Sequence, residues 1–196
     1  MYYNIYIDIF HNIFGMLFFF QVLQLSFDII STDPMEIEYI TKQYDLIYFY
    51  SSIYFLVSGL INVLDRSYLF IFHHIASWLG LHYGYVYKNP TYIYWMCQNL
   101  LAEISSIFLS VDFIVKKIWK KNQYSYMIKV FFMISYTLVR IIYLIPINIS
   151  YLITSEFEDN YKYILPIIFY LMIGLNVYWF GLIIKKFVNS LFHKKE

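Results

Sequence analysis

The sequence predicts an all-α membrane protein with six transmembrane helices and both termini in the cytosol. Of the 196 residues, 61% are hydrophobic and only 14% are charged, whereas soluble domains average about 25% charged residues. Six segments reach the roughly 20 mostly apolar residues that a helix needs to cross a bilayer. No long linker interrupts the chain, so we expect residues 1–196 to form a single multi-spanning membrane domain.

The six expected spans follow one another through short connections. The first ends at a Ser-Thr-Asp-Pro loop, and a Lys-Asn-Pro turn joins the third to the fourth. The third span carries three histidines. Ionisable side chains are costly inside a bilayer, so this span is a candidate functional site. The spans cover residues 5–30, 44–64, 67–87, 91–115, 126–150 and 161–184.

Lysine and arginine predict the orientation of these spans, because cytosolic loops carry an excess of both. With six spans, one side holds Arg66, Lys116, Lys117, Lys120, Lys121, Lys129, Lys185, Lys186, Lys194 and Lys195. The other side holds only Lys42, Lys88 and Lys162, among several acidic residues. The asymmetry places both termini in the cytosol. The basic clusters could also contact anionic lipid headgroups, but their role as ordinary topology signals is the favoured explanation.

Charge and cysteine content exclude several other classes of protein. The net charge is +1, so the chain has no bulk attraction to nucleic acid. The single cysteine, Cys97, excludes an internal disulfide framework. Glu-x-x-His repeats and histidine boxes of the kind that membrane metal enzymes use are absent, and we predict no metal site.

His73 and His74 are the candidate catalytic residues. They lie in the third span, roughly 9 Å from its cytosolic end at 1.5 Å per residue. A histidine suits proton transfer because it titrates near neutral pH, and it can also accept an acyl group. The alternative is a pair of neutral histidines that hydrogen-bond neighbouring helices. Adjacent helical residues point about 100° apart, so one can face a cavity while the other braces it.

Glu103 and Arg140 are a second group of candidate residues, and they lie near the middle of the fourth and fifth spans. A charge at a helix centre costs about 2.5–3.5 kcal/mol, which an ion pair between them would largely offset. They either form such a structural pair or contribute to a site. Asp112 has the spacing of an exposed helical ion pair with Lys116, and His82, near the opposite end of the third span, has a structural role.

Other polar groups at membrane depth include Asn99, Asn176 and Trp179. Hydrogen bonds between helices are the simplest explanation for them. Lining a channel for a lipid or an acyl chain is the more specific one.

Several segments in order resemble the TLC domain family, which includes the translocating-chain-associated protein, the longevity-assurance ceramide synthases and the ceroid-lipofuscinosis membrane protein. They are Asp65 followed by FHHIASWLGLHYG, LLAEISSIFLSVDFI at 100–114, Arg140, and GLNVYWFGLIIKKF at 174–187. The similar region covers about residues 40–190. Ceramide synthases carry acidic residues where this chain reads YIYWMCQNL, so it is more similar to the small generic members.

The resemblance implies a six-helix bundle around a central cavity that holds a long acyl chain. In the synthases, the matching histidine pair takes part in acyl transfer from acyl-coenzyme A to an amine. Carried over, His73 or His74 would be the general base or acyl acceptor, and Glu103 and Arg140 would shape the site.

The sequence therefore predicts a multi-pass protein that handles lipids, with acyl transfer as its candidate reaction. Its partners would be membrane lipids and long-chain acyl groups, with acyl-coenzyme A as co-substrate and no resident cofactor. The alternatives are a non-enzymatic lipid-sensing, lipid-binding or trafficking protein, and a scaffold whose polar residues only pair helices. Residence in the endoplasmic reticulum is implied by the family.

Overall fold

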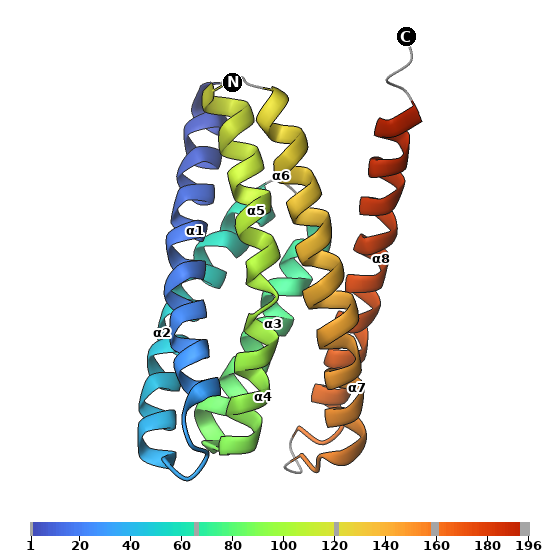
Figure 1. The fold of residues 1–196 in the computed structure, drawn as a ribbon. Coiled ribbons are helices and arrows are strands. Elements are labelled where there is room, and N and C mark those ends of the chain that lie inside the picture. The colour runs from blue at the N-terminus through green and yellow to red at the C-terminus, as the bar shows by residue number, and fades with distance from the viewer. Residues whose placement is uncertain (1, 65–66, 120–121, 158–160, 193–196) are drawn as a thin grey trace.

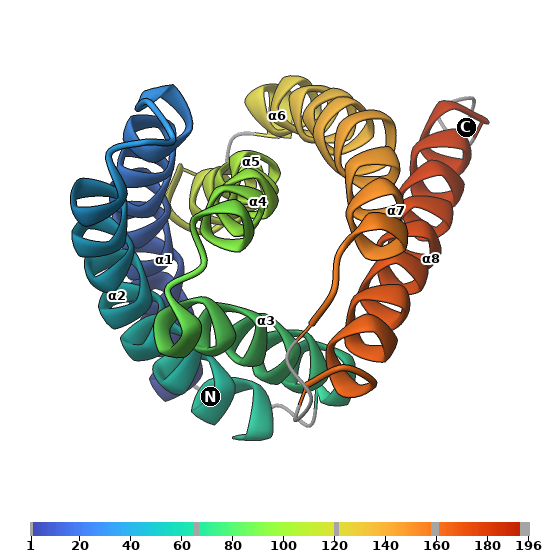
Figure 2. The same ribbon diagram turned by 90° about the horizontal axis from the view of Figure 1, so that it is seen from below.

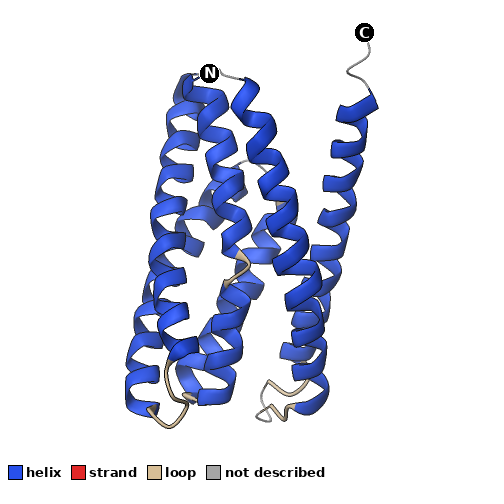
Figure 3. Cartoon of the chain, in the orientation of Figure 1, coloured by secondary structure: helices blue, strands red, loops and turns tan. Residues whose placement is uncertain are grey.

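Helices make up nearly the whole molecule. The computed structural model describes residues 2–64, 67–119, 122–157 and 161–192. Helix accounts for 91% of it, and the described residues contain no strand (Figure 3). The predicted all-α class is therefore confirmed.

Within the described residues, ten helical segments join into six rods that run alternately up and down the bundle (Figure 1). The segments are α1 (Tyr2–Ser31), α2 (Ile37–Leu64), α3 (Tyr68–Tyr87), α4 (Pro90–Leu100), α5 (Glu103–Ile114), the π-helix η1 (Val115–Trp119), α6 (Asn122–Ser135), the π-helix η2 (Tyr136–Leu144), α7 (Ile145–Thr154) and α8 (Ile164–Phe192). The fourth rod consists of α4, α5 and η1, and the fifth of α6, η2 and α7.

Five of these rods are long and apolar enough to cross a membrane, counted over the described residues. They cover Tyr6–Ser31, Ile37–Val63, Pro90–Lys117, Tyr124–Thr154 and Ile164–Asn189. The remaining rod, α3, is 20 residues long but less apolar, because it contains three histidines and four tyrosines. The chain is a multi-pass membrane protein, while the six-span count stays a prediction.

Local sequence fixes the turn between α3 and α4. The backbone N–H of Lys88 donates to the Gly84 carbonyl (3.0 Å), and Lys88 ends α3 in the left-handed region at φ 51°. The side chain of Asn89 then accepts a hydrogen bond from the backbone of Tyr92 (3.1 Å). Pro90 begins α4, where its missing N–H costs nothing.

The fourth rod lies between the other elements of the bundle. Viewed along the axis, α1 and α2 lie on one side of α4 and α5, and α6 with α7 lies on the other (Figure 2). α3 packs against α2 and also contacts α4 and α8. The hydrophobic core is concentrated where α1, α2, α3 and α4 meet, and it includes Tyr44, Tyr92 and Trp95.

The C-terminal half of α8 packs loosely against the rest of the molecule. In Figures 1 and 2 it diverges from α6. None of residues 176–189 is buried. Gly174 and Gly181 face open space, since a Cβ atom added at either would meet nothing within 4 Å. The site described next is therefore closed on this side by only the first half of α8.

Candidate functional site

A small buried cavity brings together five of the seven residues that the sequence singled out. Its volume is about 70 Å³, and it lies among α3, α4, α5, η2, α7 and α8. The five predicted residues in its lining are His73, Asn99, Glu103, Arg140 and Asn176. Ligand pockets usually measure about 300–1,000 Å³. This cavity therefore has room for a few water molecules or a small polar group, but not for the long acyl chain that we expected it to hold.

Glu103 owes its place in the cavity to a break in the fourth rod. The fourth expected span covers residues 91–115, and within it α4 ends at Leu100 and α5 begins at Glu103. Between them the backbone forms hydrogen bonds between residues three apart instead of four, such as Ala102 N–H to the Asn99 carbonyl (3.0 Å). Broken helices at membrane depth occur where the backbone is buried in protein or lines a cavity. The break puts the Glu103 carboxylate at a helix N-terminus, whose dipole favours negative charge.

Two polar side chains also donate hydrogen bonds to backbone carbonyls beside the break. The amide of Asn99 donates to the Trp95 carbonyl (3.0 Å), and the hydroxyl of Ser105 donates to the Ala102 carbonyl (2.8 Å). Asn99 therefore both lines the cavity and contacts the backbone next to the break, whereas Ser105 contacts the break but does not line the cavity.

Arg140 connects three rods through its guanidinium group. Nε donates to the Ser105 hydroxyl (2.9 Å), one terminal nitrogen to the Ser106 hydroxyl (3.1 Å), and the other to Asn176 Oδ1 (3.1 Å). The expected Glu103–Arg140 ion pair is not among the salt bridges of the described residues, which are Asp45–Lys88 and Asp112–Lys116. The guanidinium instead donates its hydrogen bonds to neutral oxygen acceptors on α5 and α8.

His73 faces this cavity. Its ring meets Trp179 edge to face, with 5.5 Å between the ring centroids. Trp179 in turn stacks on Phe70 at 5.3 Å and lies beside the lining rather than in it. The buried Nδ1 atom of His73 has no hydrogen-bond partner within the described residues. A ligand in the cavity could supply that partner.

His74 faces the opposite way, towards α1 and α2. Its Nε2 atom lies 2.8 Å from the hydroxyl of Ser58, and the same hydroxyl lies 3.0 Å from Nε2 of His11. His74 is only 8% exposed. Of the two histidines in the candidate pair, one therefore lines the cavity and the other is held in a hydrogen-bonded chain outside it.

Asn148 is a cavity residue that the sequence analysis missed. It is 6% exposed, and its Oδ1 atom has no partner within the part of the chain that the structure describes. A signal for it existed in the four-residue spacing of Tyr136, Arg140, Leu144 and Asn148, which are all buried. That spacing keeps the four side chains on one side of the η2–α7 rod.

His82 and Asp112 lie outside the cavity and make contacts between helices. His82 Nδ1 lies 3.0 Å from the hydroxyl of Tyr48, and its ring stacks on Trp78. The predicted Asp112–Lys116 ion pair is confirmed, but Asp112 is buried rather than exposed and also accepts from the Ser125 hydroxyl (2.6 Å). Asp65 lies outside the described residues. Among the residues whose placement is given, no three His, Cys, Asp or Glu side chains are grouped to hold a metal ion.

Comparison with known proteins identifies the family. A family model described as the TLC domain matches residues 8–185, which extends from α1 into the last third of α8. The match includes the first span, which the resemblance over about residues 40–190 had left out. Searches of curated proteins and of solved structures found no significant match. The chain belongs to the TLC domain family.

Proposed function

We propose that this membrane protein is an acyltransferase that acts on a lipid, with His73 as its catalytic base or acyl acceptor. The observation that carries the proposal is the position of His73. It is the histidine of the pair that faces a cavity lined by a carboxylate, a fixed guanidinium and three amides. Its buried Nδ1 atom has no hydrogen-bond partner among the described residues, and in this proposal a reacting group supplies one.

The reaction would be N-acyl transfer from acyl-coenzyme A to a lipid amine. The thioester C–S bond breaks and a C–N bond forms, while the amine loses a proton and coenzyme A leaves as its thiol. As general base, His73 would take the proton of the attacking amine. As acyl acceptor, it would carry the acyl group between the two half-reactions.

The other cavity residues would position the reacting groups. Arg140 is held by three hydrogen bonds, so it presents a fixed positive charge to an oxygen that becomes negative during transfer. The unpartnered Oδ1 of Asn148 can accept a hydrogen bond from an amine or hydroxyl donor. Glu103 would help to hold a cationic amine near His73.

The cavity would receive only the polar end of the substrate. Because its volume is about 70 Å³, the acyl chain must lie elsewhere. The loosely packed second half of α8 is the place where a chain could reach the cavity from the bilayer. In this proposal α3 also crosses the membrane, which makes six spans in total, the termini are cytosolic, and the membrane is that of the endoplasmic reticulum. The outer ends of α1 and α8 lie at the same end of the bundle, which supports an even number of spans (Figure 1).

The test distinguishes the role of His73 in acyl transfer from that of His74. The purified protein is incubated with long-chain acyl-coenzyme A and sphingoid-base or amine-bearing lipid acceptors, and N-acylated product is measured by mass spectrometry. We expect His73→Ala to lower the rate by about 10²–10⁴-fold, the usual contribution of acid–base catalysis. His74→Ala is the matched control, because that ring is held outside the cavity, and it should retain most of the activity per folded molecule. Normal transfer by His73→Ala would overturn the proposal.

A second candidate function is lipid binding or sensing without turnover. The closed cavity and the absence of acidic residues between Tyr92 and Leu100 favour it. It predicts lipid that co-purifies with the protein but no product from any acyl donor tested. Product formation that depends on His73 would exclude this alternative.

A further inference from the structure

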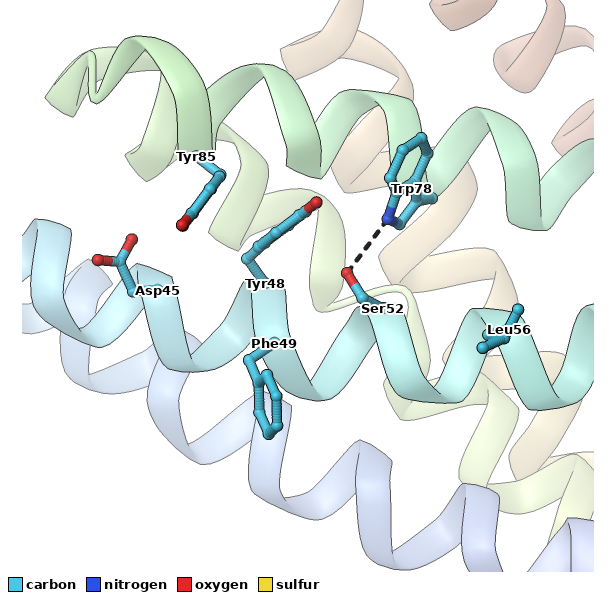
Figure 4. Close-up of a pocket in the computed structure, with 7 residues that line it drawn as sticks. All are labelled: Asp45, Tyr48, Phe49, Ser52, Leu56, Trp78 and Tyr85. Carbon is cyan, nitrogen blue, oxygen red and sulfur yellow. Dashed lines mark hydrogen bonds between the residues drawn. The ribbon is translucent and has the colours of Figure 1, made fainter.

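A second, larger hollow lies on the outer face of the molecule between α2 and α3. Its volume is about 510 Å³, and Figure 4 shows Tyr48, Trp78 and Tyr85 between the two helices, with Phe49 on the side of α2 that faces away from α3. It is lined by Asp45, Tyr48, Phe49, Ser52, Leu56, Trp78 and Tyr85, none of which lines the cavity of His73. We call this hollow the α2–α3 groove.

One end of the groove already holds an ammonium group. The side chain of Lys88 pairs with the Asp45 carboxylate, and its Nζ atom lies 4.4 Å from the centroid of the Tyr85 ring. Tyr85 is held in place by Tyr48, whose ring stacks on it at a centroid distance of 4.3 Å. A carboxylate beside an aromatic face is the chemistry that recognises a quaternary ammonium ion.

In the middle of the groove, the polar atoms of the lining side chains are already hydrogen-bonded within the protein. The indole N–H of Trp78 donates to the Ser52 hydroxyl (3.1 Å), and its ring stacks on His82. The hydroxyl of Tyr48 is engaged with His82 as well. The groove therefore offers mainly ring faces and aliphatic carbon to a ligand.

The other end is apolar and exposed. Leu56 lies at that end and is 66% exposed, and Phe49, one turn from Asp45, is 59% exposed. Asp45 and Leu56 are eleven residues apart on α2, which corresponds to roughly 16 Å at 1.5 Å per residue. The groove thus pairs a charged end, level with the end of α3, with an apolar track along the span.

We propose that the α2–α3 groove binds a choline phospholipid. The trimethylammonium group replaces the Lys88 ammonium against Asp45 and Tyr85, Lys88 moves to the adjacent phosphate, and one acyl chain follows Tyr48, Phe49 and Leu56. The exchange is feasible because the side chains of Lys88 and Asp45 are 35% and 46% exposed, and ion pairs as exposed as this contribute little. This site is independent of the proposed activity at His73.

Competition among lipids tests the proposal. The delipidated full-length protein is mixed in detergent with equimolar phosphatidylcholine, phosphatidylethanolamine, phosphatidylglycerol and cholesterol, and bound lipid is counted by native mass spectrometry. Phosphatidylcholine should predominate. Asp45→Asn and Tyr85→Leu should each lower the ratio of bound phosphatidylcholine to phosphatidylglycerol by about fivefold, the scale of one cation–π or ion contact.

Matched controls lie on α2. Tyr50 is 38% exposed, against 39% for Tyr85, but does not line the groove, so Tyr50→Leu should leave the ratio unchanged. Glu38→Gln removes an exposed carboxylate from the first turn of α2 and should also leave it unchanged. His73→Ala should keep the preference, which separates this proposal from the acyltransferase. A preference for another lipid, or a choline preference that survives both groove substitutions, would overturn it.

Discussion

His73 and His74 are neighbours in sequence but occupy different environments. Because they point about 100° apart on α3, one reaches the cavity and the other reaches α2. Ser58 has a single hydroxyl proton, so it can donate to the imidazole of either His74 or His11 and can only accept from the other. This fixes the relation between their tautomers and holds the His74 ring still.

The hydroxyl of Ser58 should contribute measurably to stability. Ser58→Ala removes the partner of a buried imidazole nitrogen, which typically costs about 1–3 kcal/mol. We expect a lower unfolding temperature in detergent. Ser51→Ala is the matched control, because Ser51 is equally buried on the same helix but its hydroxyl has no partner among the described residues. Ser51→Ala should leave the unfolding temperature unchanged or raise it. An equal drop in both variants would contradict a stabilising role for the Ser58 hydroxyl.

Gly84 is required by a close approach between α2 and α3. A Cβ atom at this position would lie 2.5 Å from the hydroxyl oxygen of Tyr44. That residue is fully buried, and its hydroxyl donates to the Leu81 carbonyl. Gly84→Ala should therefore destabilise the protein by about 1–3 kcal/mol, as overpacked cores do. Thermal unfolding of the purified protein measures this. Gly174→Ala meets nothing within 4 Å and should not lower stability, so a similar loss in both variants would exclude a steric cause.

At the scale of elements, two departures from a regular α-helix build the cavity. The α4–α5 break positions Glu103, and the π-helix η2 carries Arg140 between two α-helical segments of one rod. Neither departure has a proline at its own position, although Pro146 lies two residues after the end of η2. Departures of the π type occur frequently at functional sites.

Arg140 should be irreplaceable by lysine. Lysine keeps the charge but is a single point donor that cannot match the planar guanidinium, so Arg140→Lys should lose contacts to Ser105, Ser106 and Asn176 that join α5, η2 and α8. We expect a loss of about 2–4 kcal/mol, since each hydrogen bond to a charged group contributes about 1.5–3 kcal/mol. Thermal unfolding measures it.

The control for this prediction removes an exposed charge from the same rod. Lys129→Ala lies on α6, on the molecular surface, and should leave the unfolding temperature nearly unchanged. If Arg140→Lys were as stable as Lys129→Ala, the three hydrogen bonds would not be what joins the rods.

For the whole molecule, the topology is directly testable. Cys97 is fully buried, so the native background of thiol labelling is low. Cysteines introduced at Asp33, in the α1–α2 loop, and at Lys186, near the end of α8, should react with a membrane-impermeant maleimide from opposite sides. Asp33 should react from the non-cytosolic side and Lys186 from the cytosolic side. Labelling of both from one side would mean that the chain does not cross the membrane an even number of times.

The sequence alone determined the class of the protein and most of its candidate residues. Hydropathy and length mark the long apolar helices without any tertiary knowledge, because a bilayer imposes both properties on each helix separately. Glu103, Arg140 and the histidines were visible for the same reason, since ionisable groups are rare at membrane depth. The order of these residues also indicated the TLC domain family.

Only the tertiary structure decided which of these residues meet and how large their cavity is. Helix periodicity does not reveal the buried face of spans that are apolar on every side, so the roles of His73 and His74 could not be separated from sequence. The α4–α5 break, the π-helix and the partners of Arg140 depend on which hydrogen-bonding groups neighbouring rods present. Those are properties of packing between segments far apart in the chain, and no local pattern encodes them.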